Sequence, residues 1–365
     1  LAEELERRGL RAQLHRYDDR AGVAKANVVV VVGPPEPNGI ILSGHIDTVP
    51  FDGQPGWTRE PLRLTVEGDR AYGRGITDMK GFLAACVVAI GAIDRRRLRR
   101  PVVLLFTADE EVGCLGAERL AASLPSLLGN TPIPREAWIG EPNSFAIHHA
   151  HKSAVLFAIR VRGRGGHSGM PDSGVSAIAI AGKALELIRS YGDELRARPS
   201  SDLSPAFPES PYATINVGAI HGGTAANVIA EECELAVLYR SLPGDDPLAV
   251  HREITARLAA LDGREHAAAV HRAAIEVGEA TVVPPMPPAE GTRLEAVLRE
   301  LTGGREARGS LLAADGCRFA SLGVATLICG PGEFEQAHQP NESASLAALA
   351  RAEELIRQVV ERLCY

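Results

Sequence analysis

The sequence predicts a two-domain α/β protein, with a mostly parallel sheet in the larger domain and a smaller α+β domain inserted into it. Residues 1–150 alternate short apolar runs with longer segments that suit helices, which is typical of α/β layers. The pattern changes near Ser153, and it returns after a Pro-rich segment at Val283–Pro288. A chain of 365 residues is also long enough for about two domains.

The elements of the larger domain follow from its apolar runs. Four short runs are bounded by Gly, Pro or charged residues, as strands are, at Asn27–Val32, Gly39–Ser43, Pro101–Thr107 and Ala137–Gly140. Two longer runs, Met79–Ile93 and Leu115–Leu128, are expected to form helices. After the Pro-rich segment we expect a helix, a strand and a final helix at Thr292–Leu301, Ala325–Cys329 and Ser345–Leu363.

The inserted domain has the element order β-α-β-β-α-β, which is the order of a split βαβ fold. We expect these elements at Ala154–Val161, Ser176–Tyr191, Tyr212–Ile220, Glu232–Tyr239, Pro247–Leu261 and Ala267–Val277. The Pro-rich segment then serves as a hinge. The expected domains are therefore residues 1–152 with 283–365, and residues 153–282.

Composition excludes several classes of protein. The chain has 39 Lys and Arg against 46 Asp and Glu, and aromatic residues make up only 4%. It therefore lacks the basic surplus and the stacking side chains of nucleic-acid binders. No apolar stretch is long enough to span a membrane, and the N-terminal residues do not resemble a secretion signal. The six cysteines show no C-x-x-C spacing, so we expect reduced thiols in a cytoplasmic protein.

Imidazole and carboxylate groups follow four of the expected strands. His45 and Asp47 follow one strand, Glu110 and Glu111 a second, Glu141 a third, and His338 the last. A further carboxylate, Asp78, is expected at the start of a helix, where it could serve only as a cap. Taken singly, His45 could equally be a core histidine, and Glu110 and Glu111 could be solvated.

The convergence of these groups favours a metal site. Open α/β sheets collect ligands at the carboxyl edge of their strands, and several carboxylates cannot share a crevice without a cation. Two imidazoles with carboxylates and no cysteine suit Zn²⁺, Co²⁺ or Mn²⁺. A bridging carboxylate would suit two such ions, so the pattern predicts a dinuclear metallohydrolase.

Six ordered motifs also carry a family resemblance. The chain resembles the M20 family of zinc peptidases and deacylases over nearly its whole length. The motifs are Gly44–Pro50, Asp78–Gly81, Asp109–Glu111, Gly140–Pro142, Gly166–Ser168 and Gln336–Pro340.

The resemblance implies roles for the residues of the larger domain. His45 and Glu141 would hold one metal ion, and Glu111 and His338 the other, with Asp78 bridging the two. Asp47 would hold the His45 ring by accepting its second N–H. Glu110 would be the general base, which takes a proton from the attacking water and later delivers it to the leaving amine.

For the inserted domain, the resemblance implies a lid that forms a homodimer. His167 would reach the partner's site and stabilise the oxyanion, although an isolated His at this turn could be a surface residue. Asn227 and Arg240 would bind the substrate carboxylate, since the guanidinium fork suits a planar carboxylate. An Arg at a strand end is otherwise often an ion-pair partner.

The implied reaction is amide hydrolysis of an N-acyl amino acid, and N-acetylornithine is the expected substrate. Desuccinylation of a diaminopimelate, aminoacylase or carboxypeptidase activity remain alternatives within the family, and a catalytically silent binder is a further one. The segments Ala313–Phe319 and Asn341–Ser343 depart from the pattern of the deacetylase branch. The first is closer to the desuccinylase pattern, which leaves the acyl specificity open.

Overall fold

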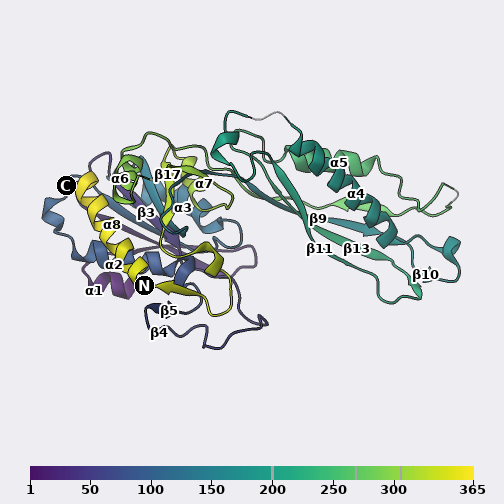
Figure 1. The fold of residues 1–365 in the computed structure, drawn as a ribbon, viewed down its shortest axis with the longest axis horizontal. Helices are drawn as coiled ribbons and strands as arrows, with labels where there is room; N and C mark the ends of the chain where they lie inside the picture. The colour runs from purple at the N-terminus through teal and green to yellow at the C-terminus, as the bar shows by residue number, and fades with distance from the viewer. Residues whose placement is uncertain (199–200, 268, 305) are drawn as a thin grey trace. The chain divides into compact units, whose positions relative to one another are not determined.

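The computed structural model describes residues 1–198, 201–267, 269–304 and 306–365 (Figure 1). The chain folds into two compact units. Unit 1 contains Leu1–His151 and Met286–Tyr365, and unit 2 contains Lys152–Pro285. Unit 2 is thus an insertion between two segments that fold together.

Unit 1 is built on an eight-stranded sheet with the order β1-β2-β6-β3-β7-β17-β8-β16. Its four central strands are parallel, whereas β1, β2 and β8 join the sheet by antiparallel pairing. The expectation of an α/β sheet is confirmed, with a parallel centre and mixed edges. The strands are β1 (Gln13–Asp18), β2 (Ala24–Val32), β3 (Ile40–His45), β6 (Val102–Thr107), β7 (Glu136–Pro142), β8 (His148–His151), β16 (Arg308–Ser310) and β17 (Ala325–Gly330).

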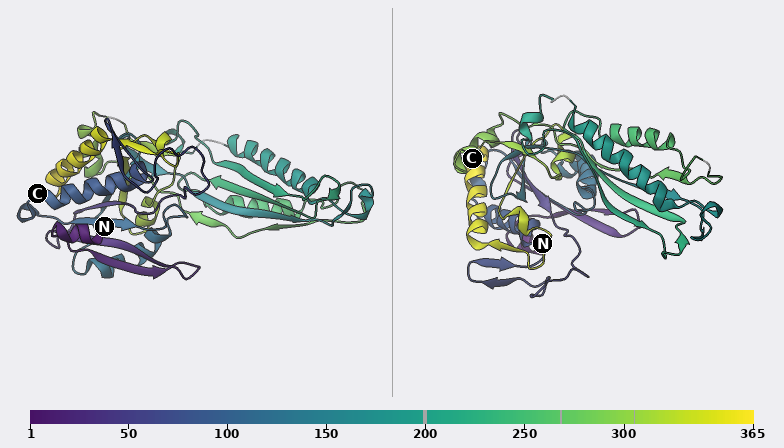
Figure 2. Two further views of the ribbon diagram at one scale, coloured as in Figure 1. Left: turned by 90° about the horizontal axis from the view of Figure 1, so that it is seen from below. Right: turned by 45° about the vertical axis from the view of Figure 1, so that its right-hand side comes forward.

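Helices cover both faces of this sheet. α2 (Gly81–Ala92) and α8 (Leu346–Cys364) pack on each other and on β3 (Figure 2). α3 (Leu115–Leu128) packs on β1, β2 and β6, and it contacts α7 (Gly316–Ala320). The crossovers from β3 to β6 and from β6 to β7 run in opposite directions across the sheet, so their right-handedness puts α2 and α3 on opposite faces. Unit 1 also contains α1 (Ala2–Arg7) and α6 (Arg293–Leu301).

Unit 2 has the expected β-α-β-β-α-β order. Its antiparallel sheet has the order β11-β13-β9-β14, with β15 also paired to β9. α4 and α5 contact each other and pack on this sheet (Figure 1). Position 268 of the expected strand 267–277 lies outside the described residues. The elements are β9 (Ala154–Arg162), α4 (Ala177–Arg196), β11 (Thr214–Gly222), β13 (Glu232–Arg240), α5 (Ala249–Ala259), β14 (Ala274–Val277) and β15 (Thr281–Val283).

Smaller elements complete both units. A three-stranded sheet in unit 1 joins β4 (Thr65–Glu67), β5 (Arg70–Tyr72) and β18 (Ser343–Ser345). In unit 2, β10 (Gly166–His167) pairs with β12 (Val228–Ile229). The short helical turns are η1 (Ile76–Lys80), η2 (Arg95–Arg97), η3 (Pro171–Ser173), η4 (Ser204–Ala206) and η5 (Phe334–Gln336).

Local sequence explains where several helices begin. The side chains of Ser176, Thr292 and Ser345 each precede a helix and accept a hydrogen bond from a backbone N–H three residues later. Such caps satisfy N–H groups that a helix cannot pair internally. β3 and β6 are buried at every position, as expected for central strands covered on both faces. Among the described residues, no helix is both long and apolar enough to cross a membrane.

Candidate metal centre

The five expected ligands come from the strand ends and one turn of unit 1. His45 is the last residue of β3, Glu141 lies in β7, and Glu111 follows β6. His338 follows η5, beyond the end of β17. Asp78 lies in η1, directly before α2. Segments far apart in the sequence therefore meet at one edge of the sheet, because parallel strands present their carboxyl ends together.

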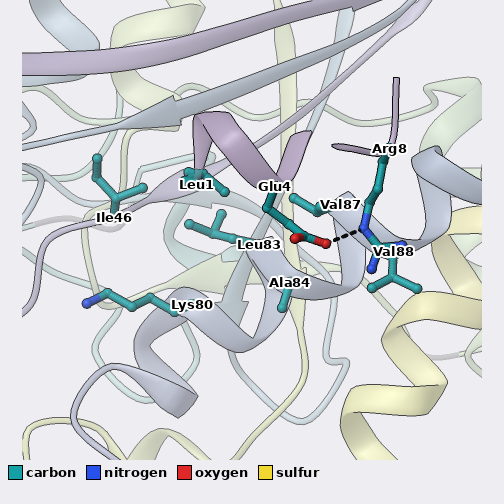
Figure 3. Close-up of a pocket in the computed structure, with 9 residues that line it drawn as sticks. All are labelled: Leu1, Glu4, Arg8, Ile46, Lys80, Leu83, Ala84, Val87 and Val88. Atoms are coloured by element: carbon teal, nitrogen blue, oxygen red, sulfur yellow. Dashed lines mark hydrogen bonds and ion pairs between the residues drawn. The ribbon is translucent and has the colours of Figure 1, made fainter. Parts of the chain in front are cut away.

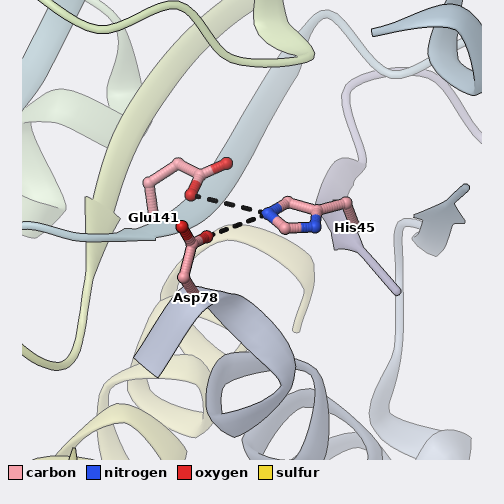
Figure 4. A group of neighbouring side chains, drawn as sticks. All are labelled: His45, Asp78 and Glu141. Atoms are coloured by element: carbon pink, nitrogen blue, oxygen red, sulfur yellow. Dashed lines mark hydrogen bonds and ion pairs between the residues drawn. The ribbon is translucent and has the colours of Figure 1, made fainter. Parts of the chain in front are cut away.

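Asp78 lies between the two imidazoles. Its Oδ1 is 2.9 Å from Nε2 of His45, and its Oδ2 is 3.0 Å from Nε2 of His338. Glu141 approaches the His45 side of this arrangement, with 4.0 Å between Oε2 and Nε2 (Figure 4). Glu111 approaches the His338 side, with 3.2 Å between Oε1 and Nε2. The cluster thus consists of two halves that share one carboxylate.

Asp78 does not start a helix, in contrast to the expectation from sequence. Its φ of −117° and ψ of 92° are not helical, and α2 begins only at Gly81. The turn packs tightly against β3, since a Cβ at Gly44 would lie 2.2 Å from Cε of Met79. A helix cap would point Asp78 at backbone N–H groups, whereas the observed turn directs its carboxylate toward His45 and His338.

The charges of the cluster compensate one another. Burial opposes a charged imidazole at His45, yet hydrogen bonds to Asp47 and Asp78 raise the pKa of His45 well above its usual value. Hydrogen bonds to Asp78 and Glu111 raise the pKa of His338 to about 10. Burial opposes ionisation of Asp78, but hydrogen bonds from His338 and His45 hold its pKa well below the usual range.

The donor set fits two divalent metal ions. His45, Asp78 and Glu141 offer ligand atoms that all lie within 4.8 Å of one another, and so do Asp78, Glu111 and His338. Each half supplies imidazole nitrogen and carboxylate oxygen, which suit Zn²⁺, Co²⁺ and Mn²⁺. A shared carboxylate with one oxygen directed to each half is the arrangement that a bridging ligand requires.

Asp47 joins the ends of β3 and β6. Its two carboxylate oxygens accept the backbone N–H groups of Glu110 and Glu111 at 3.2 and 3.1 Å. Nδ1 of His45 lies 3.1 Å from the Asp47 carbonyl oxygen and 3.6 Å from its carboxylate. Asp47 therefore contacts the segments of both Glu residues as well as the His45 ring.

Glu110 occupies a neighbourhood that sequence patterns did not indicate. The Cys114 thiol donates a hydrogen bond of 3.5 Å to its Oε1, and Asp315 lies within 4.8 Å of the same two groups. Burial, together with the nearby Asp315 and Glu111, raises the pKa of Glu110 well above its usual value, although His45 opposes this. Burial also raises the pKa of Asp315 to about 6. An elevated pKa is suited to a group that must accept and then return a proton.

The expected residues of unit 2 are arranged differently. His167 and Asn227 are both exposed. They lie close together because β10 pairs with β12 and the Ser168 N–H donates a hydrogen bond of 3.1 Å to the Asn227 carbonyl. Arg240 is the last residue of β13 and pairs with Thr214. Asn227 lies near the opposite end of β13, which at about 3.3 Å per residue is a strand of roughly 27 Å. Unit 2 therefore does not bring Arg240 together with His167 and Asn227.

Arg240 and Lys152 form a cationic pair of side chains in unit 2. Nη1 of Arg240 is buried and has no hydrogen-bond partner among the described residues. Burial and the neighbouring Arg240 lower the pKa of Lys152 to about 8. The Lys152 ammonium donates to the carbonyl oxygens of Ser210 and Tyr212. A guanidinium with a free, desolvated donor is suited to an anionic ligand.

A groove of about 450 Å³ between α1 and α2 is a separate feature (Figure 3). Its wall is mostly apolar, and its only carboxylate, that of Glu4, pairs with Arg8 at 2.7 Å. Ile46, directly after His45, and Lys80, two residues after Asp78, line the groove, but none of the five expected ligands does. The groove is therefore not the metal centre.

A two-unit α/β fold with a carboxylate and imidazole cluster at its sheet edge defines a class, the metal-dependent hydrolases. The chain belongs to peptidase family M20/M25/M40, whose model matches residues 41–362, and it is a metal-dependent amidohydrolase. Both expectations from sequence, the family and the enzyme class, are thereby confirmed.

Curated relatives match most of the chain. An acetylornithine deacetylase from Proteus mirabilis is 36% identical over 100% of this chain and 89% of its own length. Proteins of the same name from Pectobacterium atrosepticum and Myxococcus xanthus are 37% and 34% identical, covering 93% and 99% of the chain and 84% and 90% of their own lengths.

Solved structures show the same fold. An M20 family metallo-carboxypeptidase from Sulfolobus solfataricus superposes with a TM-score of 0.77 at 18% identity, covering 99% of this chain and 92% of that one. A dinuclear metal-binding M20 peptidase from Bacillus subtilis gives 0.63 at 18% identity, covering 99% and 90%.

Proposed function

We propose that this enzyme removes the acetyl group of N-acetylornithine, releasing ornithine and acetate, a step of arginine biosynthesis. The relatives named acetylornithine deacetylase, at 34–37% identity over nearly the whole chain, support this substrate. The observation that carries the chemistry is the position of Asp78, with one oxygen 2.9 Å from His45 and the other 3.0 Å from His338.

Within this proposal, five residues hold two metal ions. His45 and Glu141 would hold one ion and Glu111 and His338 the other, and Asp78 would be shared by both. We propose zinc as the metal, with cobalt and manganese as alternatives that the same donors accept. When bound, the two ions would polarise the scissile carbonyl and lower the pKa of the attacking water.

Glu110 acts as the general base. It takes a proton from the attacking water and delivers it to the departing amine, so that it begins and ends the cycle ionised. Asp47 keeps the Glu110 backbone in place through the N–H contact of 3.2 Å and orients the His45 ring.

Unit 2 contributes the substrate contacts. Arg240 and Asn227 bind the free carboxylate of the amino acid, and His167 donates to the oxyanion of the tetrahedral intermediate. His167 and Asn227 lie at the end of unit 2 opposite Arg240, so one chain does not assemble all three around one small substrate. This separation supports a homodimer in which His167 and Asn227 serve the partner's site. We further propose that the enzyme is cytoplasmic, and that neither nucleic acid nor a membrane is a partner.

The observation that favours a second candidate substrate is the sequence of residues 313–319, which is closer to the desuccinylase pattern than to that of the deacetylase branch. The corresponding activity is desuccinylation of N-succinyl-diaminopimelate. The test compares turnover of both compounds by the protein loaded with Zn²⁺, Co²⁺ or Mn²⁺. Hydrolysis of N-acetylornithine supports the first proposal. Turnover of only the succinyl compound would replace it with the second, and aminoacylase and carboxypeptidase substrates complete the panel.

A further inference from the structure

The carboxylate of Glu342, which is not among the expected metal ligands, is buried against the turn that carries Asp78. Its side chain is 1% exposed. Oε1 accepts the backbone N–H groups of Thr77 at 2.9 Å and Asp78 at 3.1 Å. Oε2 accepts the N–H of Gly75 at 2.9 Å and Nη1 of Arg74 at 2.9 Å. All four contacts fall within one segment, residues 74–78.

Arg74 extends these contacts toward the second histidine. Its Nη2 donates to Oε1 of Gln54, and its Nη1 lies 3.4 Å from the Gln339 carbonyl oxygen. Nε2 of Gln54 in turn donates to the carbonyl oxygen of His338 at 2.7 Å. The chain of contacts from Glu342 through Arg74 to Gln54, which we name the Glu342 network, therefore reaches the backbone of both Asp78 and His338.

Both of these residues need such support from outside their own segments. Asp78 lies in a turn whose φ and ψ are not helical, so helical hydrogen bonds do not fix its direction. Buried N–H groups at Gly75, Thr77 and Asp78 would be unsatisfied without the Glu342 carboxylate. His338 has a φ of 61° and a side chain 47% exposed, so little packing holds it.

We propose that Glu342 is a positioning residue, which together with Arg74 and Gln54 sets the separation of His45 and His338 across Asp78. The Glu342 carboxylate orients Asp78 by accepting its backbone N–H. Its ion pair with Arg74 connects this contact, through Gln54, to the backbone of His338. The side chains of the Glu342 network contact Asp78 and His338 only at backbone atoms. In the part of the chain that the structure describes, they contact no side chain of an expected metal ligand. The inference rests on the proposed metal centre.

The test compares Co²⁺ binding by the full chain and by Glu342→Gln, using competition with a chelating dye and the visible spectrum of bound cobalt. Glutamine has nearly the size of glutamate, but its NH₂ group would face N–H donors of residues 74–78. The turn would therefore lose some of its hydrogen bonds to residue 342. We expect cobalt affinity to fall about 10- to 100-fold, which is the usual effect of losing a hydrogen-bond partner that orients a metal ligand. The cobalt spectrum should change as well, and a merely structural role in a folded variant would not change it.

Glu333→Gln is the matched control. Glu333 pairs with Arg70 at 2.9 Å, it is exposed, and no described contact joins its side chain to Asp78 or His338. Its replacement should leave cobalt affinity and spectrum unchanged.

The outcomes separate the two proposals. A wild-type chain that binds no cobalt refutes the metal centre itself. A wild-type chain that binds two ions, with Glu342→Gln matching it in affinity and spectrum, overturns the role of Glu342. If Glu342→Gln does not unfold cooperatively, Gln54→Ala decides, because it removes the contacts of Gln54 with the His338 carbonyl, Arg74 and Trp57 but leaves the Glu342 carboxylate bound to the turn. We expect Gln54→Ala to weaken one of the two ions, and unchanged binding of both would overturn the network.

Discussion

Unit 1 and unit 2 hold their expected functional residues in opposite ways. In unit 1, residues separated by as much as 293 positions, His45 and His338, both lie about 3 Å from the same carboxylate. In unit 2, Asn227 and Arg240 are only 13 positions apart in the sequence, yet Arg240 ends β13 and Asn227 lies near the other end of that strand.

The difference follows from sheet topology. Parallel strands joined by helices return their carboxyl ends to one edge, so residues that follow different strands converge. Asn227 and Arg240, in contrast, lie near the two ends of one strand, and an extended strand keeps residues at its two ends apart. Unit 1 can therefore assemble a centre within one chain, whereas unit 2 does not bring its expected residues together.

Replacing Glu110 tests the centre of unit 1 most directly. Glu110→Gln should lower turnover of N-acetylornithine by about 10²- to 10⁴-fold or more, since it removes the general base. Metal content, measured by elemental analysis, should stay near that of wild type because Glu110 is not a proposed ligand. Glu67→Gln, which alters an exposed ion pair with Arg59, is the control. Unchanged turnover by Glu110→Gln would refute its assignment as base.

Replacing His167 tests the role of unit 2. His167→Ala should lower kcat by about 10²-fold or more, as does loss of an oxyanion donor. If His167 acts in the partner's site, mixing this variant with Glu110→Gln restores activity, since each mixed dimer then has one intact site. Refolding the two together should recover about a quarter of wild-type activity, because half of the dimers are mixed.

The reverse outcome is equally informative. If His167 serves its own chain, neither chain of a mixed dimer has an intact site, and activity stays at the level of the separate variants. Light scattering on the same samples reports whether dimers form. A fully active monomer would reject the proposed division of labour between the units.

Metal binding should release protons from unit 1. A ligand imidazole must be neutral, and the pKa of His338 is raised to about 10 in the metal-free protein. Below that pH its neutral fraction falls, so affinity for the ion at His338 should drop about tenfold for each pH unit downward. Calorimetric titration with Co²⁺ in buffers of different ionisation enthalpy counts the protons. Affinity independent of pH would contradict the assignment, and His167→Ala should leave the proton count unchanged.

Two Gly→Ala substitutions, one in each unit, should have smaller effects, which differ because the two sites are packed differently. A Cβ at Gly140, in the strand that carries Glu141, would lie 1.9 Å from the Phe82 ring. Gly140→Ala should therefore destabilise the protein by about 1–3 kcal/mol through overpacking. Gly182, inside α4 of unit 2, has open space around it, so Gly182→Ala should stabilise by about 0.5–1 kcal/mol. Chemical denaturation measures both, and equal effects would show that the strand end of unit 1 is not closely packed.

Sequence patterns predict much of this architecture because they report local periodicity and the order of motifs. The α/β class, the inserted unit and the family are confirmed, whereas the roles of the site residues stay predictions. The patterns missed contacts between distant segments, such as Asp315 beside Glu110 and Glu342 beneath Asp78. Apolar spacing does not report which buried polar groups will pair. The helix expected to begin at Asp78 begins only at Gly81, because the non-helical φ and ψ of Asp78 are not visible in the apolar spacing of the sequence.

Asp109, directly before Glu110, has a positive φ of 57° and is held by side chains from the first two strands of the sheet. Lys25 donates to one of its carboxylate oxygens at 2.8 Å, and Tyr17 donates to the other at 2.9 Å. Both partners come from the β1–β2 hairpin, which ends before the family match begins at residue 41. A fragment trimmed to the matched residues would retain every expected ligand and the base, yet the loop bearing Glu110 would lose both side-chain anchors. The contacts that hold the loop of Glu110 thus begin upstream of residue 41, where the family match starts.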